Sequence, residues 1–302
     1  MKIGIIGLGT MGYEIARNFL EQGVDVGVFD INKEATTKLA KLGAKAFENP
    51  RELATNYSYV ITILPNVHIV KSVLLAPDGL LKGFHEGSML IDMTSSDPEV
   101  TKELATIVTD KGYRMIDAPV SGGISKAIDG TLTIMVGGEK TNFEEVKPLF
   151  TIIGDNIIHV GEAGAGHTIK ALNNMISATT LAVTGEALAL GVKQGLDPTK
   201  MLEVINTSTG RSLSSEQKFP NQIVPRKFKG GFTLDLMVKD LTIAMSLADN
   251  NRAPMHAASG AYQLWKHAWA QGNPELDHTT MVKFIEDSMD VKIKAKEDQG
   301  VT

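Results

Sequence analysis

A lysine and an asparagine near the middle of the chain, Lys170 and Asn174, are the pair whose type and spacing most suggest chemistry. They stand four positions apart, so on a helix their side chains share one face. An ammonium group beside an amide can supply a proton donor and a group that orients a bound molecule. Surface lysines are common, so the weight of this pair depends on the motifs that precede it.

A glycine-rich segment near the start, Gly7-Leu8-Gly9-Thr10-Met11-Gly12, has the spacing of a dinucleotide-binding loop. It follows the apolar run Lys2–Ile6 and opens a helical pattern, the context that such a loop requires. Gly7 would permit a tight turn, Gly9 would let the backbone approach a pyrophosphate, and Gly12 would allow close helix-strand packing. Free N–H groups at the helix start favour phosphates. An ordinary strand-turn-helix unit is the alternative.

An acidic residue, Asp30, closes the next apolar run, 18 positions after Gly12. A carboxylate at this place accepts hydrogen bonds from the adenosine ribose and repels a 2′-phosphate, so NAD is favoured over NADP. Asn32 and Lys33 follow directly, and an adjacent cation could accommodate a phosphate, which leaves NADP possible. Asp30 could also serve only to start a turn.

Two further turns lie where predicted strands end, which is where an open α/β sheet places its ligand. The first is Leu64-Pro65-Asn66. In the second, Met93–Pro98, Asp97 precedes a proline and is interpreted as a helix cap. Asp117–Gly123 then interrupts the alternation of strands and helices. Within it, Ser121-Gly122-Gly123 brings a hydroxyl and uncrowded backbone N–H groups together, which suits a carboxylate. A plain glycine turn is the alternative.

The elements that must position these residues change character along the chain. In the first half, short apolar runs alternate with helical patterns, which predicts a parallel sheet covered on both faces. The expected strands are Lys2–Ile6, Asp25–Phe29, Tyr59–Leu64, Met89–Ile91, Arg114–Ile116 and Thr131–Val136. From about Gly164, helical spacing replaces this alternation.

The sequence thus predicts an α/β fold class: an N-terminal Rossmann-type doubly wound sheet followed by an all-α C-terminal domain. The expected boundaries are 1–163 for the dinucleotide-binding domain and 164–302 for a helical substrate and oligomerisation domain. Residues 164–193 are expected to form a long interdomain helix, and residues 291–302, which are charged and lack an apolar face, a loose tail.

Composition excludes several classes of partner and site. The net charge is -5 and no long basic run occurs, so neither nucleic acid nor anionic membrane is expected as a partner. The chain has no cysteine, which excludes disulfides, thiolate metal sites and cysteine nucleophiles. No His/Asp/Glu group has metal-ligand spacing, so no metal is expected.

A membrane segment and a signal peptide are also not expected. The apolar stretch Ala171–Gly185 is too short and too polar at Asn173 and Asn174 to span a bilayer. The apolar start of the chain is interrupted by glycines, which fits a buried strand better than a signal peptide. A cytoplasmic enzyme is the default, although an organelle protein whose transit peptide had been removed would look the same.

Taken together, these motifs resemble the β-hydroxyacid dehydrogenase family, which includes 3-hydroxyisobutyrate dehydrogenases and tartronate semialdehyde reductases. The resemblance covers almost the whole chain in order. It rests on Gly7–Gly12, Leu64-Pro65-Asn66, Asp117–Gly138, Gly164–Asn174 and Lys239-Asp240-Leu241. These are similar to the family's cofactor loop, Leu-Pro turn, substrate-binding signature, catalytic lysine block and late Lys-Asp-Leu motif.

The resemblance implies a role for each matching residue. Lys170 would be the catalytic lysine, and Asn174 would hold the substrate beside it. The substrate carboxylate would be bound by Ser121, Gly122 and Gly123. Cofactor contacts are implied for the whole glycine loop and for Asp30, Leu64, Pro65, Ser95 and Lys239.

Two segments depart from the family pattern. Thr94-Ser95-Ser96 replaces the commoner Ser-Thr-Ile. Its first two positions still carry hydroxyl groups. Ser125-Lys126 stands where small residues are usual. Lys126 could change substrate choice or could face solvent, and solvent is the interpretation we favour.

The implied reaction is hydride transfer between a nicotinamide and a small β-hydroxy acid or its semialdehyde. Lys170 would donate or accept the proton and stabilise negative charge on the reacting oxygen. His167 lies on the same face and is interpreted as a neighbour rather than as the acid. An NADPH-preferring semialdehyde reductase and a non-catalytic dinucleotide-binding protein are the alternatives; imine reductases rank lower because many lack a lysine here.

The sequence does not identify which hydroxy acid is the substrate. Arg211-Ser212-Leu213 and Phe219-Pro220-Asn221 could line the substrate pocket, although a loop or packing role is an equal alternative. A homodimer or homotetramer is implied by the family. An alanine-rich helix after Lys170 also suggests close packing, within or between subunits.

Overall fold

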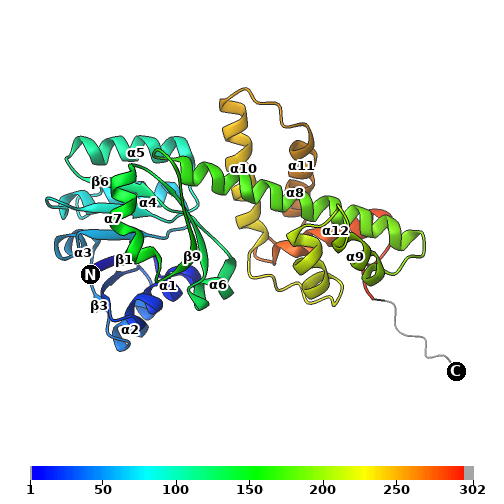
Figure 1. Cartoon of the computed structure of the whole chain (residues 1–302), viewed down its shortest axis with the longest axis horizontal. Coiled ribbons are helices and arrows are strands. Elements are labelled where there is room, and N and C mark those ends of the chain that lie inside the picture. The colour runs from blue at the N-terminus through cyan, green and yellow to red at the C-terminus, as the bar shows by residue number, and fades with distance from the viewer. Residues whose placement is uncertain (1, 296–302) are drawn as a thin grey trace. The chain divides into compact units, whose positions relative to one another are not determined.

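The computed structural model describes residues 2–295, which fall into two compact units that divide between Lys170 and Ala171. Helix α8 (Ala165–Lys193) is continuous across the division, as Figure 1 shows. The predicted boundary between residues 163 and 164 lies just before this helix, seven residues before the observed division, and stays a prediction.

The first unit is built on a sheet whose strand order is β3-β2-β1-β4-β5-β6-β8-β7, with β9 beside β8. Its first six strands have the 3-2-1-4-5-6 order of the doubly wound dinucleotide-binding fold. The strands are β1 (Lys2–Ile6), β2 (Asp25–Phe29), β3 (Lys45–Ala46), β4 (Tyr59–Thr62), β5 (Met89–Asp92), β6 (Arg114–Asp117), β7 (Val120–Ser121), β8 (Leu132–Gly137) and β9 (Gly154–Gly161). The predicted fold class is confirmed.

The far end of the sheet departs from the expected parallel pairing. β8 pairs antiparallel with β6 and β7, and parallel with β9. The strands β3, β7 and β9 were not predicted. β3 and β7 have two residues each, and β9 has the polar pair Asp155-Asn156 directly after its first residue, so none of them contains a long apolar run.

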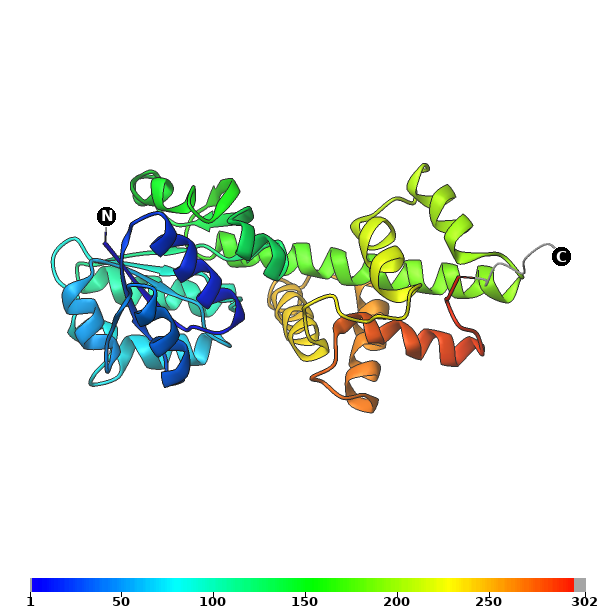
Figure 2. The same cartoon turned by 90° about the horizontal axis from the view of Figure 1, so that it is seen from below.

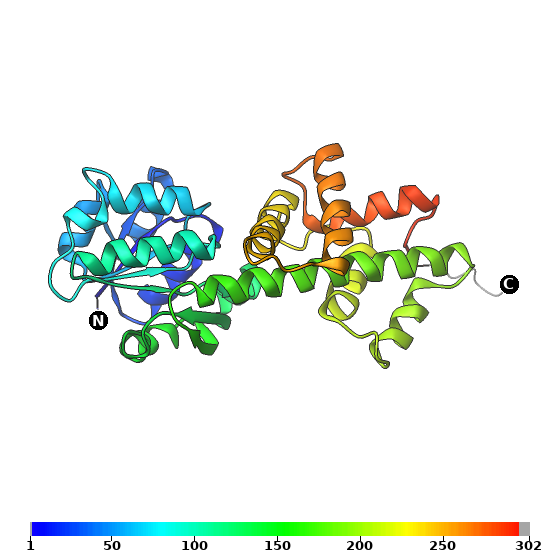
Figure 3. The same ribbon diagram turned by 90° about the horizontal axis from the view of Figure 1, so that it is seen from above.

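Helices cover both faces of this sheet, because each face has its own apolar core. One core contains Ile15 and Phe19 of α1, and the other contains Val70 of α4 and Leu104 of α5. Figure 2 shows α1 and α2 on the first face, and Figure 3 shows α4 and α5 on the second. The helices are α1 (Thr10–Glu21), α2 (Lys33–Lys41), α3 (Pro50–Asn56), α4 (Val67–Leu75), η1 (Leu80–Lys82), α5 (Pro98–Asp110), α6 (Gly123–Asp129) and α7 (Lys140–Phe150).

The second unit is a helical bundle around the later turns of α8. Its centre is the fully buried Trp265, whose indole N–H donates to the carbonyl of Ala178 at 3.2 Å. The remaining helices are α9 (Pro198–Asn206), the π-helix η2 (Ser214–Ile223), α10 (Leu234–Asn250), α11 (His256–Gln271), η3 (His278–Thr280) and α12 (Met281–Met289).

The expectation of a loose tail over residues 291–302 is wrong for its first residues. Ile293 is fully buried in the helical core, and its N–H donates to Oε1 of Glu286 at 2.7 Å. One isoleucine between lysines gives no helical or strand periodicity, which is why the sequence did not indicate this contact. Residues 296–302 lie outside the described residues.

Helix α8 is longer than the apolar stretch identified in the sequence. With 29 residues, it is the one helix in the described part of the chain that is long and apolar enough to cross a membrane. The expectation that this segment is too short is therefore wrong on length. Half of its most apolar window is nevertheless buried within the protein, as in the core helix of a bundle.

Candidate active site

The glycine loop joins the end of β1 to the start of α1. Gly7 has a φ of +96°, and a side chain there would collide with the carbonyl oxygen of Ile63. A Cβ on Gly12 would collide with the carbonyl oxygen of Gly7, so this glycine permits close packing. Gly9 faces open space and gives α1 no side-chain cap. The N–H groups at the start of α1 are therefore not capped by a side chain and can donate hydrogen bonds to a phosphate group.

Asp30, which directly follows β2, stabilises this loop through hydrogen bonds. Its Oδ2 accepts a hydrogen bond from the N–H of Leu8 at 2.5 Å, and its Oδ1 accepts one from the N–H of Asn32 at 2.7 Å. Asp30 thus starts a turn, as the alternative interpretation held. Each carboxylate oxygen can accept more than one hydrogen bond, so ribose hydroxyls can still be bound.

The turns after β4 and β5 are tied together by a buried carboxylate, Asp92. Its Oδ1 accepts hydrogen bonds from Oγ1 of Thr62 at 2.9 Å and from the N–H of Thr94 at 3.0 Å. The N–H of Leu64 donates in turn to Oγ1 of Thr94 at 3.1 Å. Burial raises the pKa of Asp92 above its usual range. This network holds the turn that carries Ser95.

Asp97 caps α5, as predicted, because its Oδ1 accepts a hydrogen bond from the N–H of Glu99 at 2.9 Å. Its carboxylate thus has a local structural role at the helix start.

Asp117, at the end of β6, fastens the start of α8. Its two oxygens accept hydrogen bonds from the N–H of Gly164 at 2.7 Å and of His167 at 2.8 Å. A carboxylate is favoured at a helix N-terminus by the helix dipole. His167 is itself buried, with Nδ1 2.8 Å from Oγ1 of Thr101. This burial supports the interpretation of His167 as a structural neighbour.

The Ser121-Gly122-Gly123 turn has the conformation that its residues suggest. Ser121 lies on β7, and Gly122 and Gly123 have φ values of +136° and +72°, which favour glycine. Both glycines are exposed, so their backbone is accessible to a ligand. Lys126 is exposed as well, with its aliphatic stem near Gly122.

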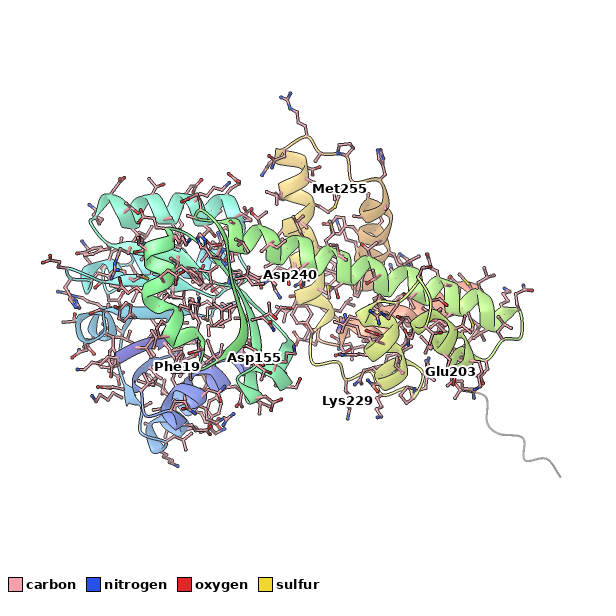
Figure 4. All side chains as sticks on the ribbon, in the orientation of Figure 1. Phe19, Asp155, Glu203, Lys229, Asp240 and Met255 are labelled. Atoms are coloured by element: carbon pink, nitrogen blue, oxygen red, sulfur yellow. The ribbon has the colours of Figure 1, made fainter. Side chains whose placement is uncertain are left out.

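Asn174, one turn after Lys170 on α8, is held by a partner that the sequence did not indicate. The asparagine is buried, and its Nδ2 donates to Oδ2 of Asp240 at 2.6 Å. Asp240 projects from α10 (Figure 4), and Nζ of Lys239 lies 3.6 Å from its other oxygen. Lys170 is half-buried. The Lys-Asp-Leu motif was the available signal, but 66 residues separate the two partners.

The two segments suggested as pocket-lining behave differently. Phe219 is fully buried in the helical core, so its side chain has a packing role. Pro220 and Asn221 are exposed, as are Arg211 and Leu213. The sequence missed Lys218, the neighbour of Phe219, which is partly buried and donates to Oγ of Ser177 at 3.2 Å.

The chain combines a doubly wound sheet, an uncapped glycine loop, an acidic residue after β2 and a helix that carries a lysine. Together these features indicate a nicotinamide-dependent oxidoreductase. Two family models cover the chain. One, described as the NAD binding domain of 6-phosphogluconate dehydrogenase, matches residues 2–161. The other, described as NAD-binding of NADP-dependent 3-hydroxyisobutyrate dehydrogenase, matches residues 164–285.

Known proteins to which the chain is similar belong to this class. The chain is 39% identical over 293 residues to 2-(hydroxymethyl)glutarate dehydrogenase of Eubacterium barkeri, with 97% of each chain covered. It is 34% identical to mitochondrial 3-hydroxyisobutyrate dehydrogenase of Homo sapiens, covering 94% of this chain and 86% of that one. The structure of Mycobacterium tuberculosis 3-hydroxyisobutyrate dehydrogenase with L-serine is similar at a TM-score of 0.88 and 29% identity, covering 94% and 98% of the two chains.

The chain belongs to the β-hydroxyacid dehydrogenase family. The predicted enzyme class is confirmed: it is an NAD(P)-dependent dehydrogenase that acts on a CH–OH group of a hydroxy acid. The non-catalytic alternative is therefore wrong.

Proposed function

We propose that this enzyme interconverts a small β-hydroxy acid and its semialdehyde with NAD, and that Lys170 is its general acid/base. The observation that carries the proposal is the arrangement on α8. Asp117 fixes the start of this helix, and Asp240 fixes the amide of Asn174, one turn after Lys170. Catalysis needs such fixed neighbours, because a misplaced proton carrier loses much of its effect.

The roles of the chain's own groups follow from their chemistry. When bound, the nicotinamide takes or returns the hydride. Lys170 accepts the hydroxyl proton in oxidation and returns it in reduction. Asn174 orients the reacting oxygen, and the Ser121 hydroxyl and the backbone of Gly122 and Gly123 bind the carboxylate. These assignments are proposals, as are the cofactor contacts of Leu64, Pro65, Ser95 and Lys239.

The loop residues fit a dinucleotide. Gly9 leaves open space beside the start of α1, where a side chain would obstruct a pyrophosphate. We assign cofactor contacts to Leu8, Thr10, Met11 and the three glycines. The phosphates are assigned to the backbone N–H groups of Gly9, Thr10, Met11 and Gly12, because the N–H of Leu8 already donates to Asp30 and that of Gly7 to the carbonyl of Phe29. Asp30 supports NAD as the preferred form. Lys33, the cation that could hold a 2′-phosphate, is paired instead with Glu48 at 2.8 Å.

Replacement of Lys170 by Ala tests the proposal. We expect kcat for hydroxy acid oxidation to fall by roughly 10²- to 10⁴-fold, the usual contribution of a general acid/base. The Kd for NAD, measured by fluorescence titration, should stay within about threefold, because the glycine loop is untouched. Lys193→Ala, on the exposed last turn of α8, is the matched control. Near wild-type activity of Lys170→Ala would contradict the assignment.

Two relatives define the substrate range to test. The Eubacterium barkeri relative is named for 2-(hydroxymethyl)glutarate, and the Mycobacterium tuberculosis structure contains L-serine. Both molecules carry a hydroxymethyl group next to the carbon that bears a carboxylate. A screen of NAD reduction should therefore include 3-hydroxyisobutyrate, glycerate, threonate, 2-(hydroxymethyl)glutarate and sulfonated analogues.

A homodimer or homotetramer is the assembly we propose, and the exposed face of α8 supports it. Large apolar side chains recur there every seven residues, with Asn173, Thr180 and Ala187 between them. They are Ile169, Ile176, Val183 and Leu190. A seven-residue apolar repeat is typical of a helix that packs along a partner helix. Such a stripe is costly in water, and a second copy of this chain would cover it.

The alanines of α8 have a different role. Ala171, Ala178, Ala182 and Ala189 are buried within the helical unit itself, whereas Ala187 is exposed. Close packing by the alanines is therefore mostly within the chain. The cytoplasm stays the predicted location.

A further inference from the structure

Lys218 is a partly buried lysine without an ion-pair partner. It lies on η2, and the only hydrogen bond of its Nζ within residues 2–295 is to the neutral Oγ of Ser177, at 3.2 Å. No carboxylate oxygen in this described part of the chain lies within ion-pair distance of Nζ. An ammonium group that is partly removed from water is costly unless an anion compensates it.

The surrounding charges do not supply that anion. Asp277 is the carboxylate whose charge acts on Lys218. It already accepts hydrogen bonds from the N–H groups of Gly231 and Thr279, at 2.8 and 3.0 Å. His278 is buried, and both burial and the charge of Lys218 lower its pKa. Burial lowers the pKa of Lys218 to about 8, and Asp277 opposes this shift. The lysine is therefore still mostly protonated at neutral pH.

Ser177 places this ammonium group relative to the proposed reacting centre. Lys170, Asn174 and Ser177 stand at positions i, i+4 and i+7 of α8, so their side chains share one face. Ser177 is about 4.5 Å farther along the helix axis than Asn174, at 1.5 Å per residue. A molecule whose hydroxyl end is held at Asn174 could therefore reach Lys218 with its other end.

The segment that carries Lys218 is itself unusual. η2 is a π-helix of ten residues, a conformation that occurs often at functional sites. Pro220 has no N–H to donate within it, and the carbonyl of Ser215 accepts a hydrogen bond from Nδ2 of Asn206 at 3.1 Å instead. On this helix Lys218 donates to Ser177, while the neighbouring Phe219 fills the core.

We propose that Lys218, with Ser177, binds the distal carboxylate of a dicarboxylic β-hydroxy acid. This inference rests on the proposed function, because it extends the substrate site at Asn174. In 2-(hydroxymethyl)glutarate, four carbon atoms separate the hydroxyl oxygen from the distal carboxylate carbon, roughly 6 Å when extended. That length is comparable with the axial rise of about 4.5 Å from Asn174 to Ser177, beside which Nζ of Lys218 lies. Lys218 would thus determine specificity rather than take part in proton transfer.

The test compares two substrates that differ in the second carboxylate, 2-(hydroxymethyl)glutarate and 3-hydroxyisobutyrate. For Lys218→Met, we expect the ratio of their kcat/KM values to fall roughly 10- to 100-fold, the loss of one charged hydrogen bond. Lys218→Arg should keep most of the ratio, and Lys193→Met should leave it unchanged. A change of less than about threefold in Lys218→Met would overturn the inference.

A binding measurement separates this inference from the proposed function. Glutarate should raise the Tm of the wild-type enzyme in the presence of NAD, and butyrate should do so much less. The difference should be lost in Lys218→Met, and its persistence there would overturn the inference. If the wild-type enzyme oxidises 3-hydroxyisobutyrate but glutarate has no effect, only the distal site is wrong. If no β-hydroxy acid is oxidised with either cofactor, the proposed function is wrong as well.

Discussion

Asp30 illustrates how one side chain can serve the fold and the ligand together. Its oxygens accept hydrogen bonds from Leu8 and Asn32, so its removal would release the glycine loop as well as any ribose contact. A substitution by Ala would therefore confuse two effects. Asn removes the negative charge and keeps one of the two acceptor oxygens, so it disturbs the loop less than Ala while it tests the electrostatic part of cofactor choice.

For Asp30→Asn, we predict that the preference for NAD over NADP falls by roughly 10- to 100-fold, because repulsion of the 2′-phosphate is lost. The measurement is the ratio of kcat/KM for the two cofactors at one ionic strength. Asp25→Asn, at the other end of β2, is the matched control. A wild-type enzyme that strongly prefers NADP would contradict our interpretation of Asp30.

The roles that sequence reasoning missed are mostly those of buried carboxylates. Asp92, Asp117 and Asp240 each order a segment of the site through hydrogen bonds to residues between 2 and 66 positions away. Their types were visible, but a carboxylate at the end of an apolar run has no pattern that names a distant partner. Glycine spacing and the Lys170–Asn174 pair could be identified because their partners are local.

At the scale of elements, the local sequence predicted those strands and helices that carry an apolar period of their own. β1 and β2 were predicted with their observed bounds, and α8 was expected one residue earlier than it begins. β3, β7 and β9 depend on neighbouring strands, because too few of their own residues are apolar. Register and pairing are tertiary properties that no short window contains.

Two glycines of the loop between β1 and α1 should respond differently to substitution by Ala. Gly12→Ala should lower the Tm by roughly 5 °C, because its Cβ would meet the carbonyl oxygen of Gly7. Gly9→Ala should leave the Tm within about 1 °C, since the residue faces open space in an extended conformation. It should still weaken NAD binding roughly tenfold or more.

Calorimetry and NAD titration check both variants. Gly260→Ala, on α11 with no neighbour near its added Cβ, is the control. Unchanged NAD affinity in Gly9→Ala would show that the pyrophosphate does not approach this position.

At the scale of the whole molecule, each unit has a core of its own. The sheet unit is closed by helices on both faces, and the bundle is centred on Trp265. What remains uncovered on α8 is the stripe formed by Ile169, Ile176, Val183 and Leu190. The sequence suggested a helix here but not which of its faces is exposed, because that depends on how the bundle packs.

This stripe predicts that charge introduced on α8 will separate the subunits. Ile176 and Val183 are 60% and 55% exposed, so replacing both by Glu removes little of the chain's own packing. It would instead bury two carboxylates in the proposed interface, at a cost of several kcal/mol. Sedimentation equilibrium should show an assembly for the wild-type enzyme and a folded single chain for the double variant.

Leu42→Glu, an exposed apolar position on the sheet unit, is the control and should keep the wild-type mass. A wild-type enzyme that sediments as an active single chain would refute the assembly itself. An assembly that survives both substitutions would instead move the interface away from this face of α8. The circular dichroism of the double variant should match the wild type, because the two side chains lie outside the helical core.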